Sequence, residues 1–393
     1  MPYQLRPYQS EAVESGTSFL LSERKRNGLI ILPCGAGKSL VIANIAKQLD
    51  GPCLVFQPGR EILQQNLAKF KSYGYNPAVF SASMGRRNVG DITLATIGSV
   101  KKRAHLFEDF PYVLVDECSL VDPKKGMYRD FFNALGGVKI LGFDATPFRL
   151  SSSSFGTILK FLTRTRPRVF DEVVYYAQNS DLYDEGFLMK PEYHEVKGFN
   201  RHALRANSTG ADYTDKSVQL HFQAINFKDK VVKVVERLMA NDRKNCLVFT
   251  RFVEEANYVA NRTGAAIVTA DTPASERQAI LDEFKRGNIR VAVNVGVLGV
   301  GFDFPELETV VLARPTMSLR IYVQQVGRCV RMAPGKESTW VVDMCSLVPQ
   351  FGKIEHLTLI DGGNGKWFYA DGDLPLTNVY FDSGGSRCKK CGA

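Results

Sequence analysis

Leu32-Pro33-Cys34-Gly35-Ala36-Gly37-Lys38-Ser39 is the stretch that decides the fold of this 393-residue sequence. It follows an apolar run, residues 28–32, and residues 39–49 behind it have the apolar spacing of a helix. Its two glycines allow backbone N–H groups to turn inward around an anion, which the start of the helix also faces. Lys38 supplies a positive charge to the outer phosphates of a nucleotide, and Ser39 a hydroxyl ligand for Mg²⁺. The sequence therefore predicts a shortened P-loop between a strand and a helix.

Short apolar runs alternate with helical stretches along most of the chain. The expected strands after the loop are residues 52–56, 91–95, 112–115 and 139–143, and a second series follows at 246–249, 265–268, 290–293, 309–312 and 339–342. Strands that are apolar almost throughout belong to parallel sheets with helices on both faces. We therefore expect an α/β chain with two successive, mostly parallel sheets.

The predicted domain boundaries follow from changes in composition. Residues 1–198 form the first domain and 216–347 the second. Between them, residues 199–215 are polar and rich in helix breakers, which is typical of a linker. Residues 348–393 are rich in Gly, Asp and aromatic side chains, and we expect them to form a small irregular appendage.

Charge and the absence of targeting signals limit the functional class. The 50 Lys+Arg against 41 Asp+Glu give a net charge of +9 and a pI near 9.0, which suits a polyanionic partner. The start lacks the basic-then-apolar layout of a signal peptide, and no apolar run approaches the ~20 residues needed to cross a bilayer. We expect a cytoplasmic protein with no membrane partner.

The eight cysteines fall into two groups. Six are scattered through apolar or motif segments, as expected of reduced thiols that act as small core residues. Cys388 and Cys391 instead have the spacing of half a zinc knuckle or ribbon. A Zn²⁺ site needs a second pair of ligands, so either the natural protein continues beyond Ala393 or the pair holds no metal.

An acidic pair stands at the end of an expected strand. Asp116 and Glu117 follow the apolar residues 112–115. A carboxylate in that position can hold the Mg²⁺ of a bound nucleotide, and its neighbour can polarise the attacking water. This pair and the P-loop together predict nucleotide hydrolysis.

A second polar constellation lies far along the chain, in Gln324-Gln325-Val326-Gly327-Arg328-Cys329-Val330-Arg331. Arg328 and Arg331 are three positions apart, which predicts one face of a helix. Hydrolysis spreads negative charge over the γ-phosphate oxygens, and a positioned guanidinium is worth about 10³–10⁵ in rate. We expect this pair, with Gln324, to serve the same reaction as the P-loop.

Several segments resemble, in order, the motifs of superfamily 2 helicases. Leu5-Arg6-Pro7-Tyr8-Gln9 resembles the adenine-reading Q motif, and residues 31–40 resemble motif I of XPB-type repair helicases. The segments similar to the remaining motifs are residues 57–61, 95–100, 116–117, 144–149, 248–251, 294–303 and 324–331. Stretches at 264–272, 313–316 and 333–336 resemble bacterial repair helicases of the RadD type, whose zinc region begins where Cys388 and Cys391 stand.

The resemblance implies a fold of two tandem RecA-like domains and a role for each motif residue. Those implied to bind ATP are Arg6, Gln9, Pro33, Cys34, Gly35, Ala36, Gly37, Lys38, Ser39, Leu40, Gly301 and Asp303. Those implied to act in hydrolysis are Lys38, Asp116, Glu117, Gln324, Arg328 and Arg331, with Ser39 and Asp116 on Mg²⁺. Those implied to hold one nucleic-acid strand are Arg60, Thr96, Ser99, Thr250, Arg251 and Asn294. Contacts at strand ends suit recognition of the phosphate backbone rather than of bases.

Three positions depart from the family pattern. Ser119 stands where DECH-type members have histidine, Asp144 where motif III has Ser or Thr, and Asn294 where motif V often has Thr. These changes leave hydrolysis intact in the prediction but put its coupling to strand separation in question.

The sequence as a whole predicts an ATP- and Mg²⁺-dependent DNA helicase or translocase that is nucleoid-associated and acts with repair or recombination proteins. Three alternatives stay open: a DNA-dependent ATPase that remodels branched DNA or protein–DNA complexes without unwinding, an RNA helicase, and a low-turnover nucleic-acid-binding scaffold. Zn²⁺ is an open question because only half a site is present.

Overall fold

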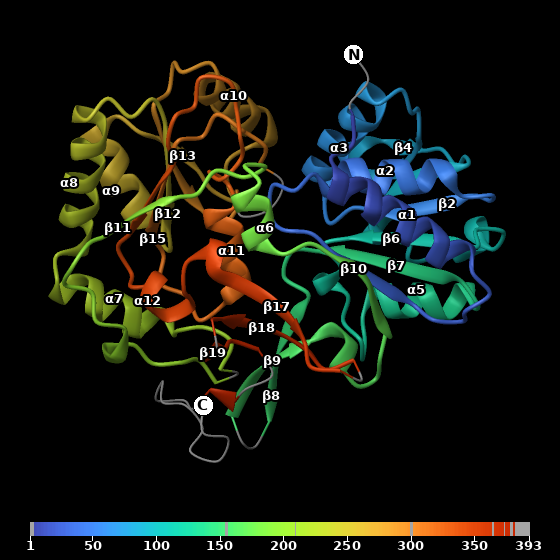
Figure 1. Cartoon of the computed structure of the whole chain (residues 1–393). Helices are drawn as coiled ribbons and strands as arrows, with labels where there is room; N and C mark the ends of the chain where they lie inside the picture. The colour runs from blue at the N-terminus through green and yellow to red at the C-terminus, as the bar shows by residue number, and fades with distance from the viewer. Residues whose placement is uncertain are drawn as a thin grey trace. The chain divides into compact units, whose positions relative to one another are not determined.

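The computed structural model describes residues 4–153, 156–208, 210–298, 302–363, 365–372, 374–377 and 380–381 (Figure 1). The chain divides into two compact units. Residues 1–149, 160–178 and 359–369 form the first, and residues 150–159, 179–358 and 370–393 form the second. Each unit contains a large parallel or mostly parallel sheet with helices, so the predicted α/β fold class is confirmed.

The first sheet carries the P-loop strand near one edge. Its order is β10 (Glu172–Tyr176), β1 (Gly28–Ile31), β7 (Lys139–Asp144), β6 (Tyr112–Asp116), β2 (Cys53–Phe56), β5 (Ile92–Ala95), β3 (Ala78–Ser81) and β4 (Arg86–Arg87). All neighbours are parallel except the β3–β4 pair. The carboxyl ends of the parallel strands therefore meet at one edge, where the loops of α/β sheets bind ligands.

Helices cover both faces of this sheet. They are α1 (Pro7–Leu21), α2 (Lys38–Gln48), α3 (Arg60–Ser72), α4 (Ile97–Val100) and α5 (Met127–Leu135). Figure 1 shows α1 and α2 on one face and α5 on the other. Phe56 packs edge-on against both Tyr128 and Phe131 of α5, with ring centroids 5.4 Å apart in each pair. These buried aromatic contacts fix α5 below the strand ends that carry the site.

The second sheet is parallel throughout. Its order is β11 (Glu192–Glu195), β16 (Trp340–Asp343), β15 (Thr309–Ala313), β12 (Cys246–Thr250), β14 (Val291–Val295) and β13 (Ala266–Val268). The helices of this unit are α6 (Asn179–Asp184), α7 (Asp215–Ala224), α8 (Phe227–Ala240), α9 (Val253–Thr263), α10 (Ala274–Lys285), α11 (Leu319–Val326) and α12 (Val348–Phe351).

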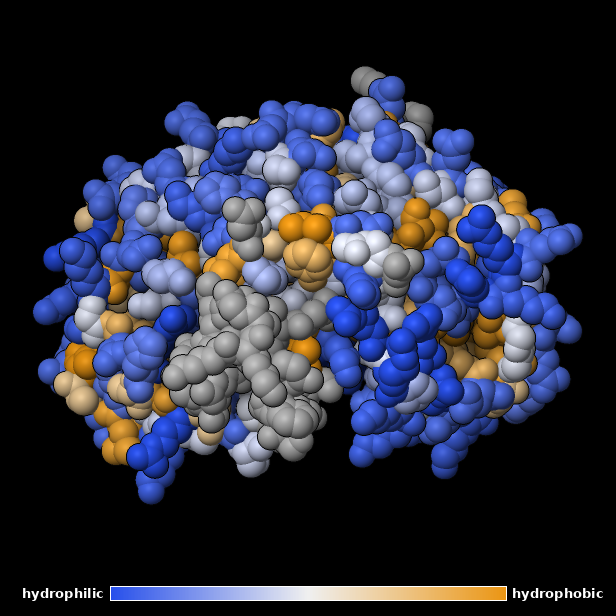
Figure 2. Space-filling model, turned by 60° about the horizontal axis from the view of Figure 1, so that its bottom comes forward, coloured by the Kyte–Doolittle hydropathy of each residue, from blue (hydrophilic) through white to orange (hydrophobic). Residues whose placement is uncertain are grey.

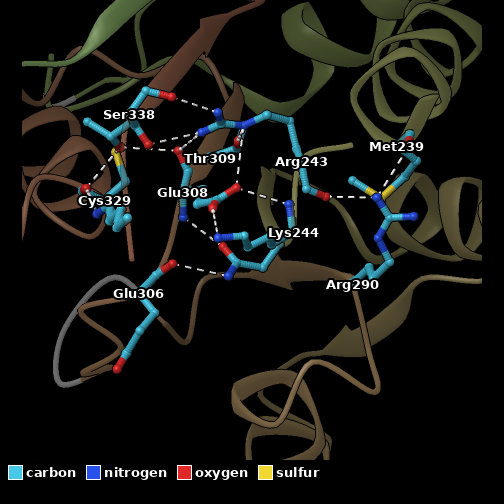
Figure 3. Close-up of polar contacts among 12 residues, drawn as sticks. Met239, Arg243, Lys244, Arg290, Glu306, Glu308, Thr309, Cys329 and Ser338 are labelled. Atoms are coloured by element: carbon cyan, nitrogen blue, oxygen red, sulfur yellow. Dashed lines mark hydrogen bonds and ion pairs between the residues drawn. The ribbon is translucent and has the colours of Figure 1, made fainter. Parts of the chain in front are cut away.

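A buried guanidinium ties together the amino edge of the second sheet (Figure 3). Arg243 donates from Nε to the Thr309 hydroxyl at 3.0 Å, from Nη1 to the Ser338 hydroxyl at 2.8 Å and from Nη2 to the Glu308 carbonyl at 2.9 Å. The Glu308 carboxylate lies 3.7 Å from Nε, and the Trp340 ring packs 4.5 Å from the guanidinium carbon. This network, here called the Arg243 cluster, joins the starts of three strands.

Two segments differ from the domain boundaries expected from sequence. Strand β11 precedes the expected boundary at residue 198 and pairs with β16 in the second sheet. The expected linker, 199–215, reaches α7, which begins at Asp215. Edge strand β11 is largely exposed, so it lacks the continuous apolar pattern by which the other strands are recognised.

The C-terminal appendage is more regular than expected where it is described. It contains α12 and a small sheet of β17 (Leu357–Asp361), β18 (Trp367–Asp371) and β19 (Leu374–Pro375). A further small sheet holds β8 (Phe148–Ser153), β9 (Gly156–Phe161) and β20 (Tyr380–Phe381). Residues 359–369 belong to the first unit, although the residues on either side of them belong to the second.

The coloured part of the face drawn in Figure 2 is predominantly polar. Figure 2 shows hydrophobic residues on this face in small separated groups among hydrophilic ones. Across the described residues, no helix combines the length and apolar character that a membrane span requires.

Candidate functional site

The P-loop has the backbone shape expected of an anion cradle. Strand β1 ends at Ile31, and the Leu32 N–H donates to the Asp144 carbonyl of the neighbouring strand at 3.1 Å. Gly35 and Gly37 have φ of +86° and +83°, which side chains other than glycine rarely adopt. Helix α2 begins directly at Lys38, so its N-terminal N–H groups face the loop.

The start of α1 packs against this loop. The Gln9 side chain donates to the Ala36 carbonyl at 2.8 Å and accepts the Arg6 N–H at 3.0 Å. The Tyr8 hydroxyl donates to the same Ala36 carbonyl at 2.9 Å. A Cβ on Gly37 would lie 2.5 Å from the Gln9 amide nitrogen, so a side chain there would displace Gln9 in addition to straining the backbone. The structure therefore places Gln9 and Arg6 beside the P-loop.

An ion pair joins the P-loop helix to the acidic strand end. The Lys38 ammonium lies 2.8 Å from Glu117 Oε1, and both side chains are mostly buried. Glu117 has a positive φ of 52°, which is strained for a residue with a side chain. Its N–H donates to the Asp116 carboxylate at 3.0 Å. The strained turn after β6 thus points the Glu117 carboxylate at the P-loop.

The electrostatics of this site are dominated by buried carboxyl groups. Burial alone would lower the pKa of Lys38, but the carboxylates of Glu117 and Asp116 more than offset it, so that pKa is raised. Burial raises the pKa of Asp116, with Lys38 opposing the shift and Glu117 adding to it. An acidic group held in such an environment gains most from a bound cation.

Asn66 connects the two residues implied to hold Mg²⁺, and sequence reasoning missed it. The Ser39 hydroxyl donates to Asn66 Oδ1 at 2.8 Å. The Asn66 amide donates to Gln57 Oε1 at 2.6 Å and approaches Asp116 Oδ2 at 3.4 Å. Asn66 is buried on α3, among Leu63, Leu67 and Phe70. A polar residue within an apolar helix face was the signal available in the sequence.

The two departures Ser119 and Asp144 contact each other. The Ser119 N–H donates to Asp144 Oδ2 at 2.7 Å. Arg149 Nη1 donates to the Ser119 carbonyl at 2.7 Å. Asp144, at the end of β7, and Arg149 therefore hold the N–H and the carbonyl of Ser119. The Ser119 side-chain hydroxyl is buried and has no hydrogen-bond partner among the described residues.

The expected helical face for the arginine pair is wrong. Helix α11 ends at Val326, with Gly327 as its C-cap, so Arg328 and Arg331 lie beyond it. Arg328 turns back and donates to the carbonyls of Gln324 at 3.1 Å and Phe302 at 2.7 Å. Arg331 instead lies in an extended segment that bridges to Leu188. The three-residue spacing predicted a helix, but the helix ends at Gly327 and the chain beyond it is extended.

Arg331 and Asp303 form an ion pair within the second unit. The structure thus brings together two residues that the resemblance assigns to nucleotide binding and hydrolysis. Gln324 is buried on α11. Gly301, Cys388 and Cys391 lie outside the described residues. Within the part of the chain that is described, no group of three potential metal ligands occurs.

The residues of the first unit that are implied to bind nucleic acid lie just after neighbouring β-strands. Thr96 directly follows β5, whereas Arg60 is exposed at the start of α3, shortly after β2. Ser99 is buried, accepts the Ala82 N–H at 2.9 Å and lies 2.9 Å from the Thr96 hydroxyl. Arg60 and Thr96 remain accessible in this arrangement, whereas Ser99 shapes the loop beneath them.

Their counterparts in the second unit are largely engaged within it. Arg251 pairs with the carboxylates of Asp212 and Asp215 and also donates to the Tyr213 carbonyl at 2.7 Å. The buried Asn294 side chain accepts two backbone N–H groups of the loop after β14. Thr250 is buried too, and its hydroxyl has no hydrogen-bond partner. A phosphate at Arg251 would have to displace two carboxylates.

The residues at the carboxyl edge of the first sheet fit a Mg²⁺–nucleotide. Mg²⁺ takes oxygen ligands, and a hydroxyl (Ser39) and a carboxylate (Asp116) converge there on one Asn66 side chain. Three carboxyl groups, those of Asp116, Glu117 and Asp144, act on a single ammonium. The glycine-lined loop supplies N–H groups for phosphate oxygens.

Two family models match the chain. One, described as "Type III restriction enzyme, res subunit", matches residues 2–149. The other, described as "Helicase conserved C-terminal domain", matches residues 229–333. The two matches cover the P-loop with the acidic strand end and the segment with Gln324 to Arg331, respectively.

Named relatives and a solved structure are similar over most of the chain. The "Putative ATP-dependent helicase IRC3" of Saccharomyces cerevisiae is 23% identical over 86% of this chain, which spans only 51% of that protein. The "DNA 3'-5' translocase XPB2" of Sulfurisphaera tokodaii is 24% identical over 84% of this chain and 79% of that protein. A fragment of a putative HsdR subunit of a type I restriction enzyme from Vibrio vulnificus YJ016 has the same fold. Its TM-score is 0.63 at 19% identity, over 98% of this chain and 71% of that one.

Proposed function

We propose that this chain, which belongs to superfamily 2 of the helicases and has their two RecA-like domains, hydrolyses Mg-ATP at the P-loop and thereby moves along and unwinds DNA. The observation that carries the proposal is the convergence of Lys38, Glu117 and Asp116 beside the glycine-lined loop. Relatives named as ATP-dependent helicases and a DNA translocase support DNA as the polymer.

The P-loop and acidic residues at the carboxyl edge of the first sheet each have a part in the proposed reaction. Ser39 and Asp116 would hold Mg²⁺, which neutralises charge on the phosphate oxygens when bound. Lys38 would exchange its Glu117 partner for the outer phosphates, whose negative charge competes with that of the carboxylate. Glu117, released from Lys38, would then orient and polarise the attacking water.

The roles of Gln324, Arg328, Arg331, Asp303 and Gly301 rest on the family pattern and belong to the same proposal. In the described conformation Arg328 donates to two carbonyls and Arg331 pairs with Asp303. Their use in turnover would therefore require the loop after α11 to release these contacts. Gln9 and Arg6, already beside the P-loop, would contact the base.

Steady-state ATP turnover with no polymer, single-stranded DNA, forked DNA and RNA tests this proposal. We expect Mg²⁺-dependent turnover that either form of DNA stimulates more than RNA does. A chain that shows no Mg²⁺-dependent turnover with any of the four would contradict the proposal. Stronger stimulation by RNA would reassign the polymer.

Translocation without unwinding is a second candidate, favoured by the name of the translocase relative and by the missing histidine at Ser119. A strand-displacement assay beside the ATPase assay separates it from helicase activity. Turnover with DNA but no displaced strand would identify the translocase.

DNA would be held through its backbone, with Arg60 and Thr96 as the accessible contacts of the first unit. Affinity for single strands should fall with salt, with a log–log slope of about −0.7 per phosphate contact. We further propose a role in DNA repair or recombination, as the resemblance to XPB- and RadD-type enzymes implies.

A further inference from the structure

The C-terminal strap, residues 359–369, is built into the first unit at several points. The Gln178 side chain donates to the Leu359 carbonyl at 2.7 Å and accepts the Leu359 N–H at 2.9 Å. The Thr163 hydroxyl donates to the Gly365 carbonyl at 3.2 Å. The rings of Trp367 and Tyr176 pack edge-on, with centroids 5.0 Å apart. The strap is thus anchored along its described length.

Its last residue, Tyr369, reaches the segment that follows β7. The side chain is buried, and its hydroxyl donates to the Ala145 carbonyl at 3.1 Å. The ring packs edge-on against Phe148, with centroids 5.8 Å apart. Burial raises the pKa of Tyr369, and the charges of Cys34 and Asp144 add to the shift, which places the phenol within electrostatic range of the P-loop.

The Ala145 carbonyl belongs to the same peptide plane as the Thr146 N–H. Because a peptide is planar, fixing the direction of its carbonyl fixes the direction of its N–H. The Thr146 N–H donates to Asp144 Oδ1 at 2.8 Å. The second oxygen of that carboxylate, Oδ2, accepts the Ser119 N–H at 2.7 Å. Five residues (Tyr369, Ala145, Thr146, Asp144 and Ser119) therefore form one connected series from the strap to the turn after Glu117.

We propose that Tyr369 is a positioning residue for the nucleotide site: its hydroxyl holds the Ala145–Thr146 peptide so that Asp144 keeps the turn after Glu117 in its reactive position. Asp144, which stands where the family pattern has Ser or Thr, would thus hold the turn at the position where that pattern has histidine. The effect on turnover rests on the proposed function, whereas the hydrogen-bonded series does not.

Tyr369→Phe is the test variant, because it removes the hydroxyl and keeps the buried ring. Tyr112→Phe is its matched control. Tyr112 is also a largely buried residue whose hydroxyl donates to a side chain, Asp50, at 2.6 Å, but it lies at the other end of β6 from Asp116. Both variants lose one tyrosine hydrogen bond within the same unit, and only one of them is connected to Ser119.

The first readout needs no activity. Amide hydrogen exchange at Ser119 and Thr146 should accelerate about two- to tenfold in Tyr369→Phe, as loss of one hydrogen bond predicts. The same amides should exchange at the wild-type rate in Tyr112→Phe. Unchanged exchange at both amides in Tyr369→Phe would overturn the proposal.

The second readout is steady-state kinetics. Tyr369→Phe should lower kcat for ATP about two- to tenfold and leave KM within about twofold, because the hydroxyl orients Glu117 without touching nucleotide. An equal loss of kcat in Tyr112→Phe would show a general stability effect and overturn the proposal. If the wild-type chain has no turnover while the exchange result holds, the proposed function fails and the positioning contact stands.

Discussion

The molecule contains two buried clusters of opposite cationic and carboxyl groups that differ in how fully they are satisfied. In the Arg243 cluster, each nitrogen of the guanidinium has an acceptor, and the Glu308 carboxylate also accepts the Lys244 N–H at 3.0 Å. At the P-loop, one ammonium lies among three carboxyl groups, and the Glu117 backbone is strained. The first cluster is complete, whereas the second has an excess of negative charge.

The two clusters lie at opposite kinds of sheet edge, and this explains why they differ. The Arg243 cluster joins strand starts, where a satisfied network stabilises the fold. The P-loop cluster lies at strand carboxyl ends, where strain and uncompensated charge mark sites that bind something else. A similar contrast separates two buried lysines. Lys38 faces carboxylates, whereas Lys336 donates to the carbonyls of Pro305, Cys329 and Arg331.

Lys38→Ala should have the largest effect on function. Because Lys38 is the cation of the incomplete cluster, its loss should reduce ATP turnover at least about 100-fold. Lys47→Ala, at the exposed end of the same helix, is the control and should retain turnover. Steady-state ATPase assays decide the matter, and comparable turnover in both variants would remove Lys38 from the site.

Arg243→Met should have the largest effect on stability. It leaves the buried Glu308 carboxylate without its guanidinium, which costs about 3–5 kcal/mol of unfolding free energy. Denaturant unfolding measures this loss, with Arg237→Met on the exposed face of α8 as the control. Turnover per folded molecule should not change. A loss of unfolding free energy no greater than that of the control would mean that the Arg243 cluster does not stabilise the fold.

Asn66→Ala should weaken Mg²⁺ binding at the site, so that turnover needs a higher Mg²⁺ concentration. Asn66 orients both Ser39 and Asp116, and loss of such a supporting residue typically costs about 10- to 100-fold in metal affinity or activity. Titration of turnover against Mg²⁺ measures the shift. Gln64→Ala, on the exposed side of α3, should titrate like the wild type. Identical curves for the two variants would exclude a supporting role.

Lys336 predicts a pH dependence that Lys38 does not share. Burial lowers the pKa of Lys336 to about 8, below its ordinary value of 10.5. Between these values the unfolded chain binds more protons than the folded one, so this group makes stability rise with pH from about 8 to about 10.5. The unfolding free energy of wild type minus that of Lys336→Met should therefore increase over this window. A difference that stays level or decreases would contradict the assignment.

Ser119→Ala should have the smallest effect. The Ser119 hydroxyl is buried without a hydrogen-bond partner, so its removal should change the unfolding free energy by within about 0.5 kcal/mol. Thr309→Val removes a hydroxyl that accepts from Arg243 and should cost about 1 kcal/mol or more. Thermal and denaturant unfolding compare them. If Ser119→Ala lost more unfolding free energy than Thr309→Val, the expected order of the two hydroxyls would be wrong.

Much of the site at the carboxyl edge of the first sheet could be predicted, because the sequence patterns that indicate it are local. Residues 28–48 show strand, loop and helix in order, and Asp116 ends an apolar run, so both were expected at the carboxyl edge of one sheet. Edge strand β11 was missed, since a largely exposed strand lacks a continuous apolar run. Edge strand β10 was missed too, although its residues 173–176 are β-branched or aromatic. The arginine pair was placed on a helix because its spacing alone does not reveal the end at Gly327.

Other parts of the candidate site have no local signal at all. Asn66 belongs to no spaced motif, and its three polar partners come from different elements. Tyr369 lies 224 positions from Ala145, and nothing near either residue indicates the contact. The assignments of site residues to ATP, Mg²⁺ and DNA stay predictions for the experiments above.

The sequence by itself determined the two parallel sheets, the P-loop and the acidic strand end, because apolar periodicity and glycine placement act over a few neighbouring residues. Only the tertiary structure decided which carboxyl groups surround Lys38, that Asn66 joins Ser39 to Asp116, and that the strap returns to Ala145. Those contacts depend on which strands and helices pack together, and packing joins residues that are far apart along the chain.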